Sequence, residues 1–194
     1  MTTPQGKLEV ICGPMFSGKS EELMRRLRRA KIAQQNVIVF KPSLDNRYSI
    51  EKIVSHAGSS FEAHSIENPE MLLDYINQES AYVIGLDEVQ FFSASILTII
   101  CKLINNGHRI ICAGLDLDFR GVPFGTIPTL LAIADTITKL SSICTPCGND
   151  AHFSQRLING SPAKFNDPII MVGAQEAYQA RCRACFSIDQ LPSW

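Results

Sequence analysis

The stretch GPMFSGKS at residues 13–20 decides the fold, because it matches the phosphate-loop pattern G-x-x-x-x-G-K-[ST]. An apolar run ends at Cys12 and a helical pattern begins near Lys19, so the loop has the strand before it and the helix after it that the pattern requires. Glycines let successive backbone N–H groups point at phosphate oxygens, and the helix N-terminus adds a favourable dipole. The pattern predicts a nucleotide site in which Lys19 reaches the β- and γ-phosphates and the Ser20 hydroxyl binds Mg²⁺.

Around this loop, short apolar runs alternate with longer helical patterns over the first two-thirds of the chain. The runs predicted as buried strands are Leu8–Cys12, Val37–Phe40, Tyr82–Leu86 and Arg109–Gly114. The segments predicted as helices are about Lys19–Gln34, Pro69–Gln78 and Ser93–Asn106. Strand–helix alternation implies right-handed crossovers, so we expect an α/β fold with a mostly parallel sheet and helices on both faces.

The sequence changes character after about Lys139, and we expect a domain boundary near Leu140. Residues 1–140 would form the nucleotide-binding α/β domain, and residues 141–194 a small C-terminal lobe. Turn-forming residues and cysteines dominate this lobe, in which we expect irregular loops at Asn149–Asp167 and Gly173–Arg181. It is too poor in apolar residues to fold as a unit without a metal.

The composition of the chain limits the kinds of protein to which it can belong. With 194 residues, 45% of them hydrophobic and 19% charged, it fits an ordinary soluble globular protein. The formal net charge of −1 offers no general attraction for nucleic acid or for an anionic membrane. Apolar stretches fall far short of the ~20 residues that span a bilayer, and the polar start up to Lys7 carries no secretory signal. We therefore expect a cytoplasmic protein.

The helix after the phosphate loop carries five basic residues, Arg25, Arg26, Arg28, Arg29 and Lys31. Glu21 and Glu22 stand four residues before the first two of them, which is the favourable order for ion pairs along a helix. We expect a solvated, salt-bridged face, with nucleic-acid binding as the competing interpretation.

Two carboxylates, Asp87 and Glu88, close the apolar run Tyr82–Leu86. In P-loop proteins the acid at this point completes the Mg²⁺ site opposite the loop hydroxyl, and Asp87 fits that role. Glu88, one residue further on, is a candidate general base that orients an attacking hydroxyl or water. A solvated loop is the alternative interpretation, and the phosphate loop upstream favours a functional one.

Four of the seven cysteines fall in two Cys-x-x-Cys pairs, Cys144 with Cys147 and Cys182 with Cys185. Two thiolates from each turn complete a tetrahedron around Zn²⁺, and such a saturated site has no open position for chemistry. A redox role is the competing interpretation. Structural zinc would anchor the residues between the pairs as a loop that can cover a ligand. The other three cysteines, Cys12, Cys101 and Cys112, lie in apolar runs and are expected in the core.

Three segments together resemble the type II thymidine kinases, the cytosolic and bacterial type. They are GPMFSGKS at residues 13–20, DEVQFF at 87–92 and GLDLDFRGVPFG at 114–125, with the cysteine pairs flanking a loop that holds Tyr178. The resemblance runs from about Lys7 to Cys185, and Pro-Met-Phe within the loop is more specific than the loop pattern itself. It implies a RecA-like P-loop domain and a zinc-stapled lobe whose lasso loop closes over the base.

The resemblance also implies an activity and a set of site residues. The enzyme would transfer the γ-phosphate of ATP to the 5′-hydroxyl of thymidine, in nucleotide salvage for DNA synthesis, with Glu88 as the catalytic base and Ser20 and Asp87 on the Mg²⁺ side. The residues expected to bind the cofactor are Gly13, Pro14, Met15, Phe16, Ser17, Gly18, Lys19, Ser20, Asp87 and Gln90. The residues expected to bind the substrate are Met15, Asp45, Arg47, Phe91, Leu115, Phe119, Phe124, Ser154, Ile169, Ile170, Met171, Val172, Gly173 and Tyr178.

Within the substrate set, the resemblance implies distinct roles. Apolar side chains would wall the sugar and the thymine ring, Ser154 would face the 5-methyl group, and Tyr178 would lie beside the sugar. The backbone of residues 169–173 would run past the thymine edge. Ala174 stands where many members carry a second glycine. The family tends toward tetramers, so a homo-oligomer is expected.

Two other functions compete with this interpretation. One is a nucleoside monophosphate kinase with a zinc lid, although such lids are usually inserted in mid-chain with a shorter gap between the pairs. The other is a P-loop ATPase whose zinc ribbon binds nucleic acid, against which the near-neutral charge and the absence of a basic, aromatic-studded tail argue.

Overall fold

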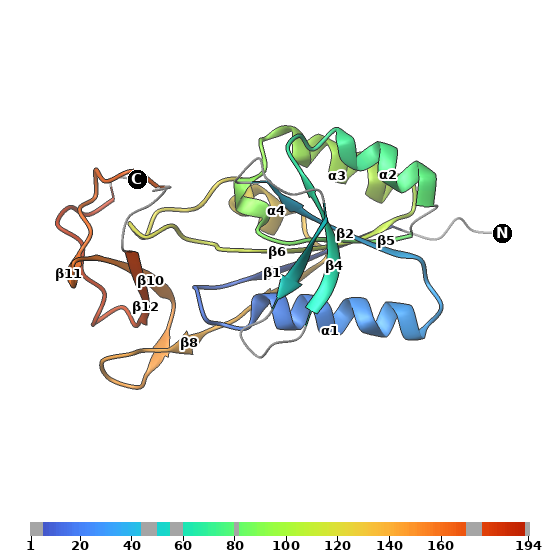
Figure 1. The fold of residues 1–194 in the computed structure, drawn as a ribbon. Helices are drawn as coiled ribbons and strands as arrows, with labels where there is room; N and C mark the ends of the chain where they lie inside the picture. Colours follow the sequence, from blue (N-terminus) through green and yellow to red (C-terminus); the bar gives the residue numbers. More distant parts are fainter. Residues whose placement is uncertain (1–5, 44–49, 55–59, 80–81, 170–175, 193–194) are drawn as a thin grey trace.

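The computed structural model describes residues 6–43, 50–54, 60–79, 82–169 and 176–192 (Figure 1). In chain order the elements of the first part are β1 (Lys7–Cys12), α1 (Lys19–Ile32), β2 (Val37–Pro42), β3 (Ile50–Val54), β4 (Ser60–Ile66), α2 (Met71–Glu79), β5 (Val83–Leu86), the 3₁₀ turn η1 (Val89–Phe91), α3 (Ser95–Asn105), β6 (Arg109–Gly114), α4 (Ile127–Ile133) and β7 (Thr136–Lys139). The C-terminal lobe adds β8 (Ser142–Ile143), β9 (Asp150–Ala151), β10 (Phe153–Ile158), β11 (Ser161–Pro162) and β12 (Glu176–Arg181). Within the described ranges, no helix has the length and apolar character needed to cross a membrane.

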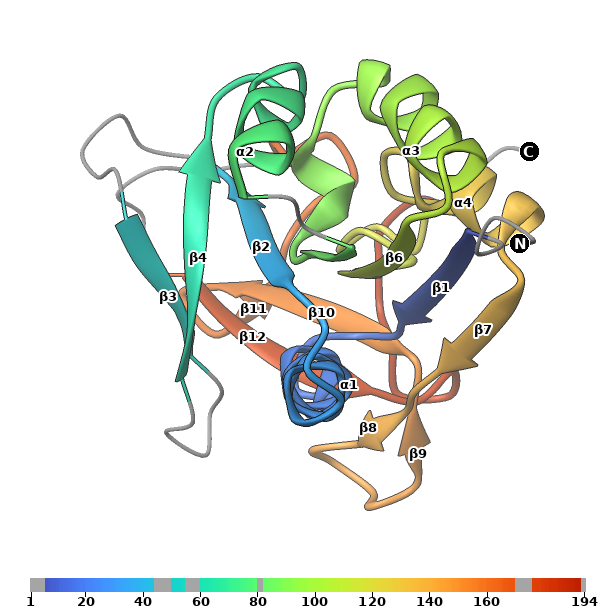
Figure 2. The ribbon, with the colours of Figure 1, turned by 90° about the vertical axis from the view of Figure 1, so that its right-hand side faces the viewer.

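Seven of the described strands form one sheet in the order β3-β4-β2-β5-β6-β1-β7. All neighbours in it pair in parallel except β3, which runs antiparallel to β4 at the edge. The view of Figure 2 shows α1 on one side of the sheet and α2, α3 and α4 on the other. The expected mostly parallel α/β fold with helices on both faces is therefore confirmed.

The two faces of the sheet are built from alternating residues of the same strands. In β1, Leu8, Val10 and Cys12 face the core under α2, α3 and α4, whereas Ile11 faces the smaller core under α1. Strands buried on both faces in this way read as continuous apolar runs. That is why β1, β2, β5 and β6 were all predicted.

Four elements of the large sheet domain, namely β3, β4, α4 and β7, were not predicted. The strands lie at or near the edges of the sheet and carry mixed polar sequences, such as SFEAHSI in β4 and TITK in β7. Helix α4 contains Pro128, which reads as a helix breaker, but this proline lies in the first turn, where its missing N–H has no helical partner to lose.

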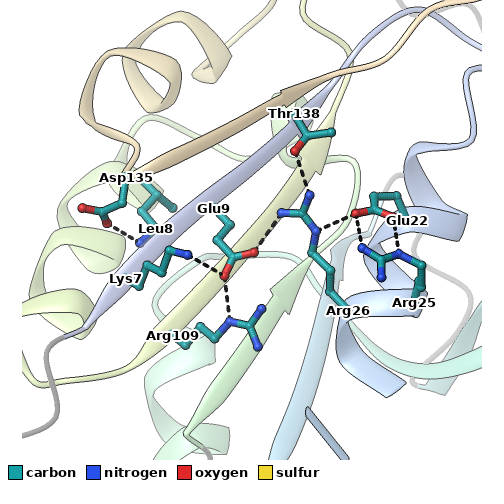
Figure 3. Close-up of polar contacts among 9 residues, drawn as sticks. All are labelled: Lys7, Leu8, Glu9, Glu22, Arg25, Arg26, Arg109, Asp135 and Thr138. Carbon is teal, nitrogen blue, oxygen red and sulfur yellow. Dashed lines mark hydrogen bonds and ion pairs between the residues drawn. The ribbon is translucent and has the colours of Figure 1, made fainter. Parts of the chain in front are cut away.

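A buried carboxylate, Glu9, joins β1 to its neighbours on the α1 side of the sheet (Figure 3). Its side chain shares the face of Ile11 and is only 6% exposed. One carboxylate oxygen accepts from Arg26 of α1 at 2.8 Å, and the other accepts from Arg109 of β6 at 2.8 Å and lies 3.5 Å from the ammonium of Lys7. This cluster of charges ties a helix and two strands together.

The basic face of α1 only partly follows the sequence expectation. Arg25 lies on the surface, as expected, but it pairs with Glu22, three residues before it, with Nε and Oε2 2.6 Å apart. Arg26 instead turns toward the sheet and, besides Glu9 and Glu22, donates to the hydroxyl of Thr138 on β7 at 2.7 Å. The expected pair of Glu22 with Arg26 is thus formed, but Arg26 belongs to the sheet–helix interface and not to a solvated face.

The C-terminal lobe is more regular than the sequence suggests. Strands β9, β10 and β11 fall in the predicted loop Asn149–Asp167, and β12 takes up the described residues of the predicted loop Gly173–Arg181, so both predictions are wrong there. β10 pairs antiparallel with β11 and β12, and β8 with β9. Strand β10 escapes notice because it carries Ser154, Gln155 and Arg156, polar residues that are nevertheless buried. A strand normally shows apolar residues at its buried positions.

The three single cysteines do not share one environment. Cys12 and Cys112 are buried in strands of the large sheet, as expected, whereas Cys101 on α3 is exposed. The expectation for Cys101 is therefore wrong. The helix turns this position to solvent, while Ile96, Ile99, Ile100 and Leu103 form its buried stripe.

We expect Glu9→Gln to lower the free energy of unfolding by about 3 kcal/mol at pH 7, because a buried carboxylate is removed and two partly buried guanidinium groups lose their charged partner. Burial raises the pKa of Glu9, but the hydrogen bond from Arg109 and the charges of Arg109, Lys7 and Arg26 lower it further, so that it lies below its ordinary value. A carboxyl whose pKa is lower in the folded state contributes all its stability above its unfolded pKa, about 4.3, and loses it as the pH falls through the folded value.

The gap between wild type and Glu9→Gln should therefore be full at neutral pH and should close as the pH falls below about 4. Urea unfolding at a series of pH values measures it. Glu67→Gln, at an exposed position beyond β4, is the matched control and should unfold like the wild type. Equal stability of Glu9→Gln and wild type at pH 7 would contradict the structural role given to this carboxylate.

Candidate functional site

A cavity of about 710 Å³ opens where the parallel strands end, between the large sheet and the C-terminal lobe. Its position is the usual one for a ligand site in an open α/β sheet, and its size suits a small molecule. Residues of the phosphate loop line one part of it, and aromatic residues and the C-terminal lobe line another. The sixteen lining residues are Met15, Phe16, Gly18, Lys19, Ser20, Glu21, Glu88, Phe91, Leu115, Leu117, Asp118, Phe119, Phe124, Ser154, Ile169 and Tyr178.

The phosphate loop, residues 13–20, joins β1 to α1 as the sequence predicts. It begins at Gly13, whose φ of +146° and close packing leave no room for a side chain, because a Cβ there would lie 2.5 Å from the carbonyl oxygen of Leu140. It ends at Gly18, which has φ +81° and precedes the first turn of α1. The loop therefore presents the N-terminus of α1 to the cavity.

Lys19 lies at the bottom of this loop with its ammonium turned inward. Lys19 is 8% exposed, and its Nζ donates to the carbonyl oxygen of Pro14 at 2.6 Å. Burial lowers the pKa of Lys19, although the negative charges of Glu88, Asp87 and Asp116 oppose that shift. The lysine is thus a buried cation near acidic groups, at the end of the phosphate loop.

Ser20 and Asp87 meet across the end of the sheet, as expected for a magnesium site. The Ser20 hydroxyl donates to Oδ2 of Asp87 at 3.2 Å, from the first turn of α1 to the end of β5. Burial and the neighbouring charge of Glu88 both raise the pKa of Asp87 above its ordinary value. A hard cation is favoured by this donor set, a hydroxyl beside a carboxylate in a site where negative charge is concentrated.

Glu88 follows directly and is held in an unusual backbone conformation. Its φ of +50° lies in the left-handed region that non-glycine residues rarely adopt, and such residues gather at functional sites. Its side chain lines the cavity, and one carboxylate oxygen accepts from the amide of Gln90. The same amide group accepts the backbone N–H of Leu115 at 3.1 Å. Gln90 does not line the cavity; it holds Glu88 and Leu115 in place from beneath.

The apolar part of the cavity comes from two segments, residues 88–92 and 114–125. Phe91 and Phe124 meet edge to face with their ring centroids 5.3 Å apart, and Phe119 is almost fully buried. Leu115 and Leu117 complete this wall. All the aromatic residues predicted for the substrate are therefore brought together.

Three lining residues, Glu21, Leu117 and Asp118, were not predicted. The signal for Leu117 was present, because Leu115, Leu117 and Phe119 alternate as the side chains of an extended segment do. Asp118 also shapes its own turn, since it accepts the backbone N–H of Arg120 at 2.8 Å.

The C-terminal lobe closes the cavity with Ser154, Ile169 and Tyr178, all predicted to bind substrate. The Ser154 hydroxyl accepts the backbone N–H of Met15 at 2.9 Å and so joins the lobe directly to the phosphate loop. Behind these residues lies Arg156, which sequence reasoning missed because a lone basic residue in an expected loop carries no pattern.

Other predicted residues lie beside the cavity or outside the described residues. Gly13, Pro14, Ser17 and Asp87 support the site without lining it; the Ser17 hydroxyl, for instance, donates to the carbonyl of Pro14 at 2.8 Å. The predicted substrate residues that lie outside the described ranges are Asp45, Arg47, Ile170, Met171, Val172 and Gly173.

The four paired cysteines converge on one point. The sulfur atoms of Cys144, Cys147, Cys182 and Cys185 all lie within 4.8 Å of one another, and those of Cys147 and Cys182 are 3.6 Å apart. Four thiolates at the usual 2.3 Å from Zn²⁺ in a tetrahedron lie about 3.8 Å from each other. The cluster is compact enough for four thiolates to bind one Zn²⁺, and such a site leaves no ligand position open.

Backbone hydrogen bonds hold the two cysteine turns against each other. Within the turns, Gly148 donates to the carbonyl of Cys144 at 2.8 Å, and Cys185 to that of Cys182 at 3.1 Å. Between them, Thr145 donates to the carbonyl of Ala180, the last but one residue of β12, at 3.0 Å. A metal here would therefore fix the end of β12, the strand that carries Tyr178 into the cavity.

We expect the purified protein to contain about one zinc per chain. Cys185→Ser should lose most of the metal and melt at a clearly lower temperature, because the lobe has few apolar residues to hold it together. Elemental analysis and thermal unfolding measure the two effects. Cys101→Ser, which removes an exposed cysteine outside the cluster, should keep both the zinc and the melting temperature. A Cys185→Ser variant with unchanged zinc content would rule out the four-cysteine site.

Residues 6–186 match a family model described as "Thymidine kinase". The matched span covers nearly the whole chain. It contains the phosphate loop, the acidic pair, all sixteen residues that line the cavity, and the four cysteines.

Proposed function

The chain belongs to the thymidine kinase family, and we propose that it transfers the γ-phosphate of ATP to the 5′-hydroxyl of thymidine. One observation carries the proposal. A single cavity is lined both by the phosphate loop and by a set of aromatic residues, and Glu88 belongs to the same lining. The family match lends no support to the two alternatives, a monophosphate kinase with a zinc lid and an ATPase acting on nucleic acid.

The donor phosphates would bind at the phosphate-loop end. The backbone N–H groups at the start of α1 and the buried ammonium of Lys19 would bind the β- and γ-phosphates. Ser20 and Asp87 would hold Mg²⁺, which neutralises the charge on the phosphate oxygens when it is bound. Lys19 would then exchange its contact with Pro14 for phosphate oxygens.

The acceptor would bind at the aromatic end with its 5′-hydroxyl toward Glu88. Phe91, Phe119 and Phe124 supply flat apolar surfaces for a base and a sugar. Glu88 would accept the hydroxyl proton and, more importantly, orient the oxygen for attack, because phosphoryl transfer has a loose transition state in which positioning dominates. The bond from Gln90 and the left-handed backbone would keep the carboxylate in that orientation.

The C-terminal lobe would cover the acceptor. Ile169 and Tyr178 already line the cavity, and the cysteine cluster anchors the strand that carries Tyr178. A cover that excludes water would protect the γ-phosphate from hydrolysis. Recognition of the thymine edge by residues 169–173, a homotetrameric state and a cytoplasmic location are further parts of the proposal.

A substrate panel tests the proposal most directly. With ATP–Mg²⁺, we expect phosphate transfer to thymidine and not to thymidylate, AMP or deoxycytidine, and no stimulation of ATP hydrolysis by single-stranded DNA. Product analysis by chromatography measures each case. Transfer to thymidylate without transfer to thymidine would overturn the proposal in favour of a monophosphate kinase.

Glu88→Gln should lower kcat by about 10²- to 10⁴-fold, because the amide cannot take the hydroxyl proton. The KM for thymidine and for ATP should change little, since the shape of the side chain is kept. Steady-state kinetics on both substrates give these values, and Glu67→Gln, at an exposed position that does not line the cavity, is the control. A Glu88→Gln enzyme that turns over near the wild-type rate would exclude Glu88 as the base.

A further inference from the structure

We propose that Arg156 is a positioning residue that shapes the acceptor end of the cavity from behind. Its buried guanidinium would hold three wall segments at once and thereby set the affinity for the nucleoside. The proposal rests on the proposed function, and it adds to the site a residue that does not itself line the cavity.

The burial of Arg156 is the first reason. It is 0% exposed and heads the fully buried side chains of the described residues in size. A guanidinium stays charged in proteins, and removing a charge from water is costly unless hydrogen bonds compensate for it. An apolar side chain would fill the same space in β10 without this cost. The groups that contact the guanidinium must therefore account for a charged side chain at this buried position.

The contacts of Arg156 supply that explanation. Nε donates to the Tyr178 hydroxyl at 2.9 Å, and the two terminal nitrogens donate to the adjacent main-chain carbonyls of Pro168 and Ile169. The face of the guanidinium lies over the ring of Phe119, with Cζ 4.0 Å from the ring centroid. All three nitrogens and one face of the group are thus engaged.

These partners come from three separate parts of the chain, and three of them line the cavity. Phe119 belongs to the segment 114–125, Ile169 to the loop after β11, and Tyr178 to β12. In the β10–β12 ladder Arg156 lies directly opposite Tyr178. Because alternate residues of a strand share a face, Arg156 also lies on the same side of β10 as Ser154, the residue bound to the phosphate loop.

The shape of the guanidinium suits this task better than an ammonium would. Its planar fork can donate along fixed directions to two consecutive carbonyls while its third nitrogen donates elsewhere. Lysine keeps the positive charge but concentrates its donors at one point, so it cannot reach all three acceptors together. Methionine keeps much of the volume and none of the donors.

The comparison of Arg156→Lys and Arg156→Met tests the proposal. We expect the KM for thymidine to rise by roughly 10- to 100-fold in Arg156→Met, as when hydrogen bonds to a charged group are lost, and by less in Arg156→Lys. The KM for ATP should stay within about threefold of the wild type, since the phosphate loop is intact. Arg28→Met, the same change at an exposed arginine of α1, should leave both KM values unchanged.

A purely structural role would give a different result. Arg156→Lys or Arg156→Met would then melt at a lower temperature, while the folded fraction kept the wild-type KM for thymidine, and that outcome would overturn the proposal. If Arg156→Met does not fold, the KM for thymidine of Arg156→Lys and its thermal shift with thymidine against that with ATP decide the question. A wild-type enzyme that fails to phosphorylate thymidine would overturn the proposed function and this inference with it.

Discussion

The close packing of Gly13 against the carbonyl of Leu140 is the contact from which the rest of the site is arranged. At that point the phosphate loop leaves β1, and the chain passes from β7 into the C-terminal lobe. The backbone N–H of Leu140 donates to the carbonyl of Cys12 at 2.8 Å, so the two strand ends are bound together just before both segments turn away. A side chain at residue 13 would force them apart and separate the phosphate loop from the C-terminal part of the cavity lining.

Two further hydrogen bonds connect the phosphate loop with the C-terminal lobe. The Ser142 hydroxyl donates to the carbonyl of Phe16 at 3.1 Å, and the Ser154 hydroxyl accepts from Met15 at 2.9 Å. The phosphate loop thus contacts both the C-terminal lobe and Asp87. Catalysis by positioning needs both sides, because donor and acceptor have to be held in one geometry.

The sequence predicted those parts whose chemistry is visible in residue type and spacing. The phosphate loop, the two carboxylates Asp87 and Glu88, and the cysteine cluster have residue types and spacings that few other structures share. The inner strands are apolar on both faces, so they are visible as apolar runs. β10 was missed for the opposite reason. Its buried Ser154 and Arg156 face partners far away in the chain, such as Met15 and Ile169, and local patterns carry no trace of such partners. Glu9 and Arg26 were likewise not foreseen as partners, since they are 17 residues apart in sequence and meet only when α1 packs on the sheet.

The cysteine cluster has a consequence for what the lobe can contain. Around the cysteines the described buried apolar residues form only a very small core with Ala151 and Ala180, and the lobe adds few others, namely Phe153, Leu157 and Ala163. Coordination bonds would carry the cohesion that larger domains obtain from leucine and isoleucine. Strand β10 would then not need an apolar side chain at every buried position. Some of its buried positions could instead hold hydroxyl, amide and guanidinium groups. Cohesion from a bound metal would in this way make room for a polar interior next to the cavity.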